Sequence, residues 1–365
     1  MRAVGIILAG GDSSKLQELT YRRAVAAMPI AGSYRSIDFA LSNMANSHVN
    51  KVAVLTQYNS RSSKWWDFGR KQGGLYVFPP TITKENEDWY RGTADAIYQN
   101  LDFLKRCHEP YVIITSGDAV YKLDYSKVLE YHMDTKADIT VVCKEMEPDT
   151  DFSRFGTVKV DDEMRIVEFE EKTSSPDSYL ISTGIYIIRR RMLIDLIEQS
   201  AVEKKYDFVR DILIRYKNLK RICAYKIDDY WCNIATVDAY YQTNMDFLKP
   251  EVRKYFWHEY PAVYSKVTDL PPAKYNPGAA VKNSLVSSGC IINGTVENSV
   301  LFKKVFVGNN CVIRNSIILN DVYLGDNTYI ENCIVESRST IRANARYVSG
   351  GGIRIVVEDG ERYEL

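Results

Sequence analysis

A short pattern recurs in the C-terminal part of the chain and limits what that part can fold into. An asparagine, a small residue and two aliphatic residues begin at positions separated by 15, 17 and 17 residues, namely Asn283, Asn298, Asn315 and Asn332. Aliphatic residues recur between them at steps of about six: Val307, Ile313, Leu324, Ile330 and Ile341. Such steps form the flat sides of a triangular coil, with one aliphatic side chain per side pointing inward. The repeat therefore predicts a left-handed parallel β-helix over residues 281–365, because an antiparallel sandwich would alternate without a fixed period.

The role of this coil is constrained by the histidines. Coils of this kind often belong to acyltransferases, which need a histidine base, yet the four histidines (48, 108, 132 and 258) all lie outside it. This argues against acetyl transfer and favours a stacking and assembly element. The last residues, "GGGIRIVVEDGERYEL", predict a two-strand ribbon that turns at Asp359-Gly360 and closes the open edge of the coil.

The N-terminal part has a different pattern of apolar residues. Short β-branched runs at 3–10, 51–58, 110–118 and 137–144 alternate with helical spacing at 93–107 and 124–135. Alternating strands and helices predict an α/β fold, a Rossmann-like domain with a mostly parallel sheet whose ligands bind beyond the carboxyl ends of the strands. We expect this domain to span 1–248, a Pro-rich and aromatic linker 249–280, and the coil 281–365.

Charge and cysteine usage exclude some classes of partner. The 47 basic and 47 acidic residues cancel, so no net field would gather nucleic acid or an anionic membrane. The seven cysteines contain no CxxC pair and are interpreted as small buried residues in a reducing compartment. The first apolar run is too short for a signal segment or a membrane span, which predicts a cytoplasmic protein with a small-molecule partner.

Three stretches carry candidate chemistry. Gly10-Gly11 follows the first strand, where backbone N–H groups could approach phosphate, although a Gly-Gly after a strand is also a common turn. Asp118 follows the strand "YVIIT" and could hold Mg²⁺, or it could be a helix cap or turn residue. Glu171-Lys172 ends the run "FEEK", where the lysine could hold a sugar phosphate or be a solvated strand end.

Taken together, the blocks of this sequence resemble a known family. "ILAGGDSSKL", "GSYRSIDFALSNMANS", "LTQY", "WYRGTADAIYQN", "SGDAVYKLDY", "FEEK", "STGIYI" and "YWCNIATVDAYYQTNMDF" occur in the order and at about the separations of bacterial ADP-glucose pyrophosphorylases. The resemblance covers nearly the whole chain, including the coil. It implies a glucose-1-phosphate adenylyltransferase, in which the sugar phosphate attacks the α-phosphorus of ATP and yields ADP-glucose and pyrophosphate for glycogen synthesis.

The resemblance also implies roles for particular residues. Lys15 and Asp118 would be catalytic positions, with Mg²⁺ held at Asp118. The nucleotide would lie against Gly10, Gly11, Gln57, Gly92 and Thr93, and glucose-1-phosphate would face Tyr90, Glu171, Lys172 and Ser182.

Three departures from the family pattern fall on this chemistry. The family loop reads GGxGxRL. In this chain Ser13 replaces its third glycine and Lys15 replaces its arginine. The serine puts a Cβ where backbone should meet phosphate, and the lysine offers a point charge instead of the two-pronged guanidinium. In the family motif RAKPA, Val25 replaces a lysine associated with effector or phosphate binding, and Ala26 replaces a proline. Asn233 stands where a second carboxylate shares the metal. Losing a preorganised charge of this kind costs about 2–4 kcal/mol of transition-state stabilisation, or roughly 10² to 10³ in rate.

These departures are similar to those of the GlgD-type regulatory subunit known in the family from some Gram-positive bacteria. Such a chain would be weakly active or inactive alone and would raise the activity of a homologous catalytic subunit within a hetero- or homotetramer. It would retain a pocket for ATP, glucose-1-phosphate or another sugar-phosphate effector. Three alternatives stay open: an active adenylyltransferase, a sugar nucleotidyltransferase for another base or sugar, and a structural protein without a ligand.

Overall fold

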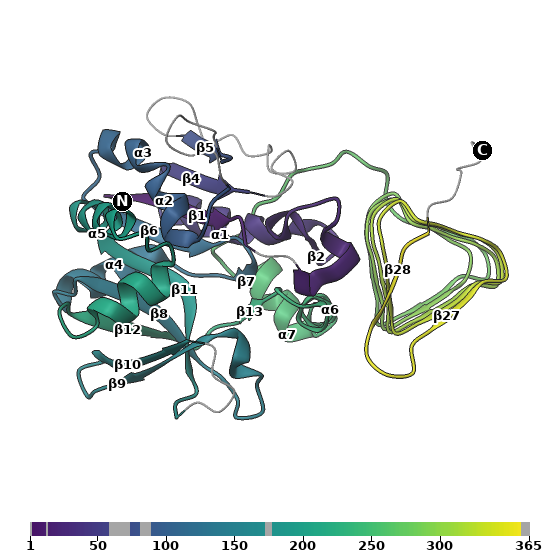
Figure 1. Ribbon diagram of the computed structural model, residues 1–365. Helices are drawn as coiled ribbons and strands as arrows, with labels where there is room; N and C mark the ends of the chain where they lie inside the picture. Colours follow the sequence, from purple (N-terminus) through teal and green to yellow (C-terminus); the bar gives the residue numbers. More distant parts are fainter. Residues whose placement is uncertain (1, 12–13, 58–73, 81–88, 172–176, 359–365) are drawn as a thin grey trace. The chain divides into compact units, whose positions relative to one another are not determined.

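The structure is a computed structural model that describes residues 2–11, 14–57, 74–80, 89–171 and 177–358 (Figure 1). The chain divides into two compact units. The sheet unit comprises Met1–Gly11, Ala40–Gly117 and Tyr121–Trp231, and the coil unit comprises Asp12–Phe39, Asp118–Val120 and Cys232–Leu365. Within the described ranges, no helix has the length and apolar character that a membrane crossing requires.

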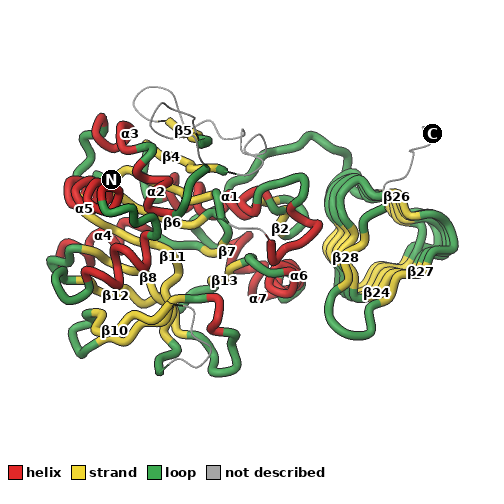
Figure 2. The backbone as a smooth tube through the Cα atoms, in the orientation of Figure 1, coloured by secondary structure: helices red, strands yellow, loops and turns green. Residues whose placement is uncertain are grey.

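The sheet unit is built on a nine-stranded mixed sheet (Figure 2). Its parallel part has the order β6 (Tyr111–Ser116), β1 (Ala3–Ala9), β4 (Lys51–Thr56) and β5 (Gly74–Phe78). Beyond β6 the sheet continues through β11 (Leu180–Arg189), β9 (Gly156–Val160) and β10 (Ile166–Glu171), and β11 also pairs with β8 (Ile139–Glu145), which pairs with β12 (Ile222–Ile227). The four sequence-predicted strands are therefore confirmed, and the α/β class with them.

Helices of the same unit pack on this sheet. They are α2 (Thr93–Tyr98), α3 (Leu101–Arg106), α4 (Tyr125–Asp134) and α5 (Arg190–Val202), while α1 (Ser36–Asn46) precedes β4. The helix predicted over 93–107 is broken in two, because Asn100 leaves the helical conformation and its side-chain N–H₂ group donates to the Ala96 carbonyl at 2.9 Å. Asp124, rather than Asp118, caps α4 by accepting from the Ser126 N–H at 2.9 Å.

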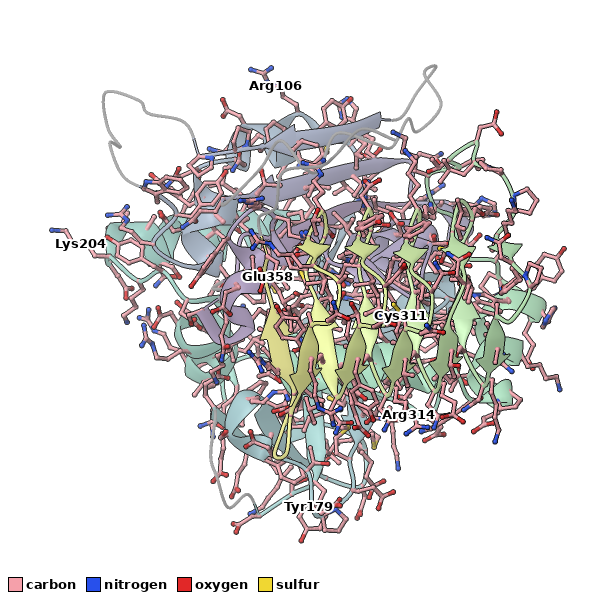
Figure 3. All side chains as sticks on the ribbon, turned by 90° about the vertical axis from the view of Figure 1, so that its right-hand side faces the viewer. Arg106, Tyr179, Lys204, Cys311, Arg314 and Glu358 are labelled. Atoms are coloured by element: carbon pink, nitrogen blue, oxygen red, sulfur yellow. The ribbon has the colours of Figure 1, made fainter. Side chains whose placement is uncertain are left out.

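The coil consists of three parallel sheets of five strands each. The first has β14 (Lys274–Tyr275), β17 (Ile291–Ile292), β20 (Phe306–Val307), β23 (Tyr323–Leu324) and β26 (Thr340–Ile341). The second has β15 (Ala280–Lys282), β18 (Thr295–Glu297), β21 (Val312–Arg314), β24 (Tyr329–Glu331) and β27 (Arg346–Val348). The third has β16 (Leu285–Val286), β19 (Val300–Leu301), β22 (Ile317–Ile318), β25 (Cys333–Val335) and β28 (Arg354–Val356). Figure 3 shows these strands stacked side by side, with Arg314 on the outer surface.

The spacing of the sequence repeat matches the register in which the strands of the coil pair. Leu285 pairs with Val300, Val300 with Ile317 and Ile317 with Ile334, which reproduces the spacings of 15, 17 and 17. The four repeat asparagines occupy corners with positive φ, between 43° and 54°. Asparagine tolerates this left-handed conformation better than other residues with a Cβ, so the pattern places it where the chain turns.

The C-terminal ribbon is only partly borne out by the structure. Arg354–Val356, the first arm of the predicted ribbon, pairs in parallel with β25 and extends the third sheet of the coil. The reason is packing, because Val356 is 3% exposed and continues the inward ladder that contains Val335. The predicted turn at Asp359-Gly360 lies outside the described residues.

The coil unit also contains shorter elements that precede or adjoin the coil. They are η1 (Ser14–Thr20), η2 (Val25–Ala27), β2 (Pro29–Ile30), β3 (Tyr34–Arg35), α6 (Val237–Asp246), α7 (Pro250–Arg253) and η6 (Lys254–His258). In addition, β7 (Ala119–Tyr121) pairs with β13 (Trp231–Asn233) in a small separate sheet. The seven cysteines all lie within the described residues and form no disulfide bond, and all but the half-buried Cys232 are buried, as the sequence predicts.

Candidate functional site

The carboxyl ends of three parallel strands bring the first set of predicted residues together. The register pairs Ala9 with Thr56, so Gly10 and Gln57 follow neighbouring strand ends. A Cβ added to Gly10 would lie 3.0 Å from the Gln57 Cβ, whereas one on Gly11 would meet nothing within 4 Å. Gly117 closes the third strand end, where its N–H donates to the Leu8 carbonyl at 3.0 Å. Gly10 and Gly117 therefore follow neighbouring strand ends at the same edge of the sheet, which is where the sequence predicts a phosphate-facing loop.

The predicted pair Gly92-Thr93 packs against residues 206–208. A Cβ on Gly92 would lie 2.3 Å from the Tyr206 carbonyl oxygen, which accepts N–H bonds from Ala94 at 2.8 Å and Asp95 at 3.3 Å. The Thr93 hydroxyl accepts from the Phe208 N–H at 3.0 Å. Glycine is needed at position 92 because no side chain fits between the two backbones.

Segment 206–208 was missed by sequence reasoning, although it carries a recognisable signal. Asp207 accepts from the Arg210 N–H at 2.7 Å, and Asp211 reaches back to the N–H groups of Tyr206 and Asp207 at 3.0 and 2.9 Å. This is the reciprocal pattern of a helix start, and two aspartates four residues apart before an apolar run could have indicated it.

Tyr90 is buried, and its hydroxyl is engaged within the protein. It donates to the Phe78 carbonyl at 3.2 Å and accepts from the side-chain N–H₂ group of Asn100 at 3.0 Å. Burial raises the pKa of Tyr90, so its hydroxyl stays protonated at neutral pH. These bonds fix the residue next to the Gly92 turn.

Glu171 and Ser182 are brought together by β9, which pairs with both of their strands. The Ser182 hydroxyl lies 3.4 Å from the Tyr186 hydroxyl. Burial raises the pKa of Tyr186, and the negative charges of Glu171 and Asp207 act in the same direction. Tyr186 is thus a further polar group of this cluster that sequence reasoning did not single out, and Lys172 lies outside the described residues.

The motif "STGIYI" contains a β-bulge that sets the orientation of the Ser182 side chain. The register between β11 and β8 shifts between Ser182 and Ile185, and Gly184 within this bulge has φ of 76°. A β-bulge with glycine in the left-handed region re-aims the neighbouring side chains. The glycine of the motif therefore has a backbone role.

The coil unit contains the predicted metal corner. Asp118 and Asn233 lie at paired strands, because β7 pairs with β13 and the Ile234 N–H donates to the Asp118 carbonyl at 3.0 Å. The side-chain oxygen of Asn233 accepts from the Ala235 N–H at 2.9 Å. Among the described residues, no three His, Cys, Asp or Glu side chains gather in a way that could hold a metal ion.

These donors fit a tightly held Mg²⁺ poorly. Mg²⁺ prefers carboxylate oxygens, and the two described residues of this corner offer one carboxylate, that of Asp118, and the amide oxygen of Asn233, which already accepts a backbone bond. Lys15 is exposed on η1, Val25 is half-buried on η2, and Ser13 lies outside the described residues. At the metal corner, Asn233 brings no charge, and its side-chain amide is held in place by the hydrogen bond from the Ala235 N–H.

The scaffold block "SNMANS" holds the chain that follows Asp118. The Asn43 side chain donates to the Tyr121 carbonyl at 3.3 Å and accepts from the Leu123 N–H at 3.1 Å. The Tyr121 hydroxyl lies 2.7 Å from the hydroxyls of both Thr115 and Tyr125. A fully buried network of this kind fixes backbone position, because every broken bond leaves an unpaired polar group.

Comparison with known proteins agrees with this geometry. A nucleotidyl transferase family model matches residues 4–250, and a GlmU-like C-terminal hexapeptide model matches residues 271–348. Glucose-1-phosphate adenylyltransferase of Clostridium botulinum (strain Eklund 17B / Type B) is 41% identical over 321 residues, which cover 85% of this chain and 83% of the relative. The chain belongs to the glucose-1-phosphate adenylyltransferase family.

Other members of this family align over similar lengths. The enzyme of Geobacillus stearothermophilus is 38% identical over 322 residues, or 86% of this chain and 83% of the relative. That of Bacillus cereus (strain ATCC 10987 / NRS 248) is 40% identical over 322 residues, or 86% of this chain and 85% of the relative. The family resemblance found in the motifs is thereby confirmed along most of the chain.

Proposed function

We propose that this chain is a regulatory, catalytically impaired subunit of glucose-1-phosphate adenylyltransferase. It would assemble with a homologous catalytic subunit in a heterotetramer and raise that subunit's rate of ADP-glucose synthesis from ATP and glucose-1-phosphate. Transfer to phosphorus depends on positioning and on neutralising the charge that develops. The observation that carries the proposal is the single carboxylate of the metal corner, where Asn233 is tied to the Ala235 N–H.

The pocket residues support a retained sensor function. Gly10 beside Gln57, Gly92 beside Tyr206, and Glu171 with Ser182 keep the backbone and polar groups that a nucleotide and a sugar phosphate would contact. A chain that binds these ligands without turning them over can report on them through subunit contacts. The effect on the partner is then a coupling free energy between sites.

A first experiment tests the proposed role directly. The homologous catalytic subunit from the same genome is assayed for ADP-glucose formation with and without this chain, at a fixed concentration of the catalytic subunit. We expect the rate to rise about fivefold or more on co-assembly, as a coupling free energy of about 1 kcal/mol would give. An unchanged rate in a mixture that forms a stable complex would contradict the proposal.

A second candidate is an active adenylyltransferase in its own right, which the retention of Asp118 and the 41% identity to the Clostridium botulinum relative favour. The isolated chain is assayed for pyrophosphate release with ATP, glucose-1-phosphate and Mg²⁺. We expect near-background release, and a gain when Ser13→Gly, Lys15→Arg and Asn233→Asp are combined. Asn310→Asp in the exposed coil is the matched control and should gain nothing. Brisk release by the unmodified chain would establish the second candidate instead.

A further inference from the structure

One face of the coil is buried although its side chains point away from the coil interior. In the third sheet, the inward ladder contains Leu301, Ile318 and Val335, which belong to the coil core. The alternate ladder of Val300, Ile317 and Ile334 is also 0% exposed. Other parts of the coil unit must therefore cover this sheet, which we call the covered sheet.

Two contacts show which parts cover it. The Tyr241 hydroxyl of α6 donates to the Asn315 carbonyl at 2.8 Å. A Cβ on Gly32 would lie 2.2 Å from the Ser287 hydroxyl oxygen, so the turn between β2 and β3 also lies against the coil. The segment after the glycine loop and α6 are thus packed on the coil within one unit.

A buried ion pair lies at this contact. Arg23 follows η1, and its Nη2 pairs with Oε1 of Glu336, which follows β25. The two side chains are only 15% and 10% exposed. By comparison, the pair of Arg314 and Glu297, at 3.0 Å on the outer surface of the coil, is 46% and 34% exposed.

The buried pair is incompletely satisfied. Glu336 Oε1 also accepts from the Ser337 N–H at 2.8 Å, yet Glu336 Oε2, Arg23 Nη1 and the Ser337 hydroxyl have no partner in the described part of the chain. Burial raises the pKa of Glu336, against the opposing effect of Arg23. A desolvated pair of this kind adds little to stability, but removing one partner leaves an uncompensated buried charge. It therefore couples the positions of the two segments that carry it.

The two segments have different roles. Arg23 lies between η1 and η2, and η1 follows the Gly10-Gly11 loop, with Leu16 and Leu19 buried. Glu336 belongs to a corner of the coil, the proposed assembly element. We propose that Arg23 and Glu336 form a latch through which the coil holds residues 14–27 in place. Through this latch, subunit contacts on the coil would act on the Gly10-Gly11 loop. This second step rests on the proposed regulatory function.

Hydrogen exchange of the full-length chain tests the latch itself. Glu336→Gln removes the charge with little change of shape, and Glu297→Gln does the same to the exposed pair as a matched control. We expect amides of residues 14–27 to exchange about tenfold faster or more in Glu336→Gln, with β1 and β6 unchanged and no effect of the control. Unchanged exchange at 14–27, or equal acceleration of all segments, would overturn the latch.

A double variant covers the case in which a single variant fails to fold. Arg23→Met and Glu336→Leu are made singly and together, and the midpoint of thermal unfolding is measured. Because the double variant buries no charge, we expect its midpoint to lie above those of both single variants. Additive losses would show that the two residues do not act as a pair.

An activation assay separates the latch from the proposed function. Mixed with the catalytic homologue, Glu336→Gln should still assemble but should lose most of the activation given by the unmodified chain. Equal activation by both would overturn transmission through the latch. No activation by the unmodified chain would instead refute the proposed function, and the exchange experiment would still decide whether the latch exists.

Discussion

The two units differ in what the family pattern has kept. Most positions that we predict to contact a ligand and that match the family, among them Gly10, Gln57, Gly92 and Ser182, belong to the sheet unit. The departures at Lys15, Val25, Ala26 and Asn233 all belong to the coil unit, as does Ser13 by its position in the chain. The predicted binding residues therefore lie mostly in the sheet unit, and the departures from the family pattern lie in the coil unit.

The difference has a physical reason. The retained positions also hold the fold together, because Gly92 fits against the Tyr206 carbonyl and Thr93 accepts from the Phe208 N–H. At position 233 the fold makes no such demand, because the bond that Asn233 accepts from the Ala235 N–H is one that an aspartate could accept equally well. Substitutions that remove chemistry without leaving a buried group unpaired cost little stability.

The largest expected effect tests the sheet unit at Gly92. Gly92→Ala places a Cβ 2.3 Å from a backbone oxygen, and we expect at least about 3 kcal/mol loss in the free energy of unfolding. Gly11→Ala, in open space, is the matched control and should change it by less than about 0.5 kcal/mol. Urea unfolding measures both. Similar stabilities of the two variants would contradict the claim that the retained Gly92 is required by the fold of the sheet unit.

A middle-sized effect is expected from pH, also in the sheet unit. His132 is buried, its Nδ1 lies 2.8 Å from the Thr140 hydroxyl, and burial lowers its pKa from 6.5 to about 4. Below pH 6.5 the unfolded chain binds a proton that the folded chain does not, so stability falls as pH falls. Between pH 7 and pH 5 we expect a loss of about 2 kcal/mol.

The matched comparison for this prediction is between two histidines. Unfolding by urea is measured across that pH range for His132→Gln and for His108→Gln, which changes an exposed histidine. The first should lose this part of the pH dependence and the second should keep it. An unaltered pH profile in His132→Gln would contradict the assignment.

The smallest effect is expected at the metal corner of the coil unit. Asn233→Asp should change the free energy of unfolding by less than about 0.5 kcal/mol, because the new carboxylate can accept the same Ala235 N–H. Thermal unfolding at low ionic strength without Mg²⁺ is the measurement. A destabilisation above about 1 kcal/mol would mean that the amide is required by the fold, and the contrast between the units would then be weaker.

Much of the fold could be predicted because its signals are local. The repeat set the coil register, since each corner asparagine and each inward aliphatic residue recurs at the same step. Four strands of the sheet, β1, β4, β6 and β8, were visible as β-branched runs, whereas the parallel strands β5 and β12 were not predicted. The break at Asn100 and the position of β28 were missed, because a side-chain bond and a packing ladder decided them.

The candidate site divides in the same way. The sequence predicted from strand ends that Gly10 lies near Gln57, and the resemblance to the family implied that Asp118 lies near Asn233; the structure has both pairs close together. Tyr186 and residues 206–208 were not predicted, since they reach the site from strands and turns distant in sequence.

By itself, the sequence determined the periodicity of the coil and the alternation of strands and helices in the sheet unit, because each depends on residues close together in the chain. Only the tertiary structure decided that Glu336 meets Arg23, that Tyr206 excludes a side chain at Gly92, and that one face of the coil is covered. Those contacts join residues far apart in the chain, and long-range packing, not local propensity, selects them.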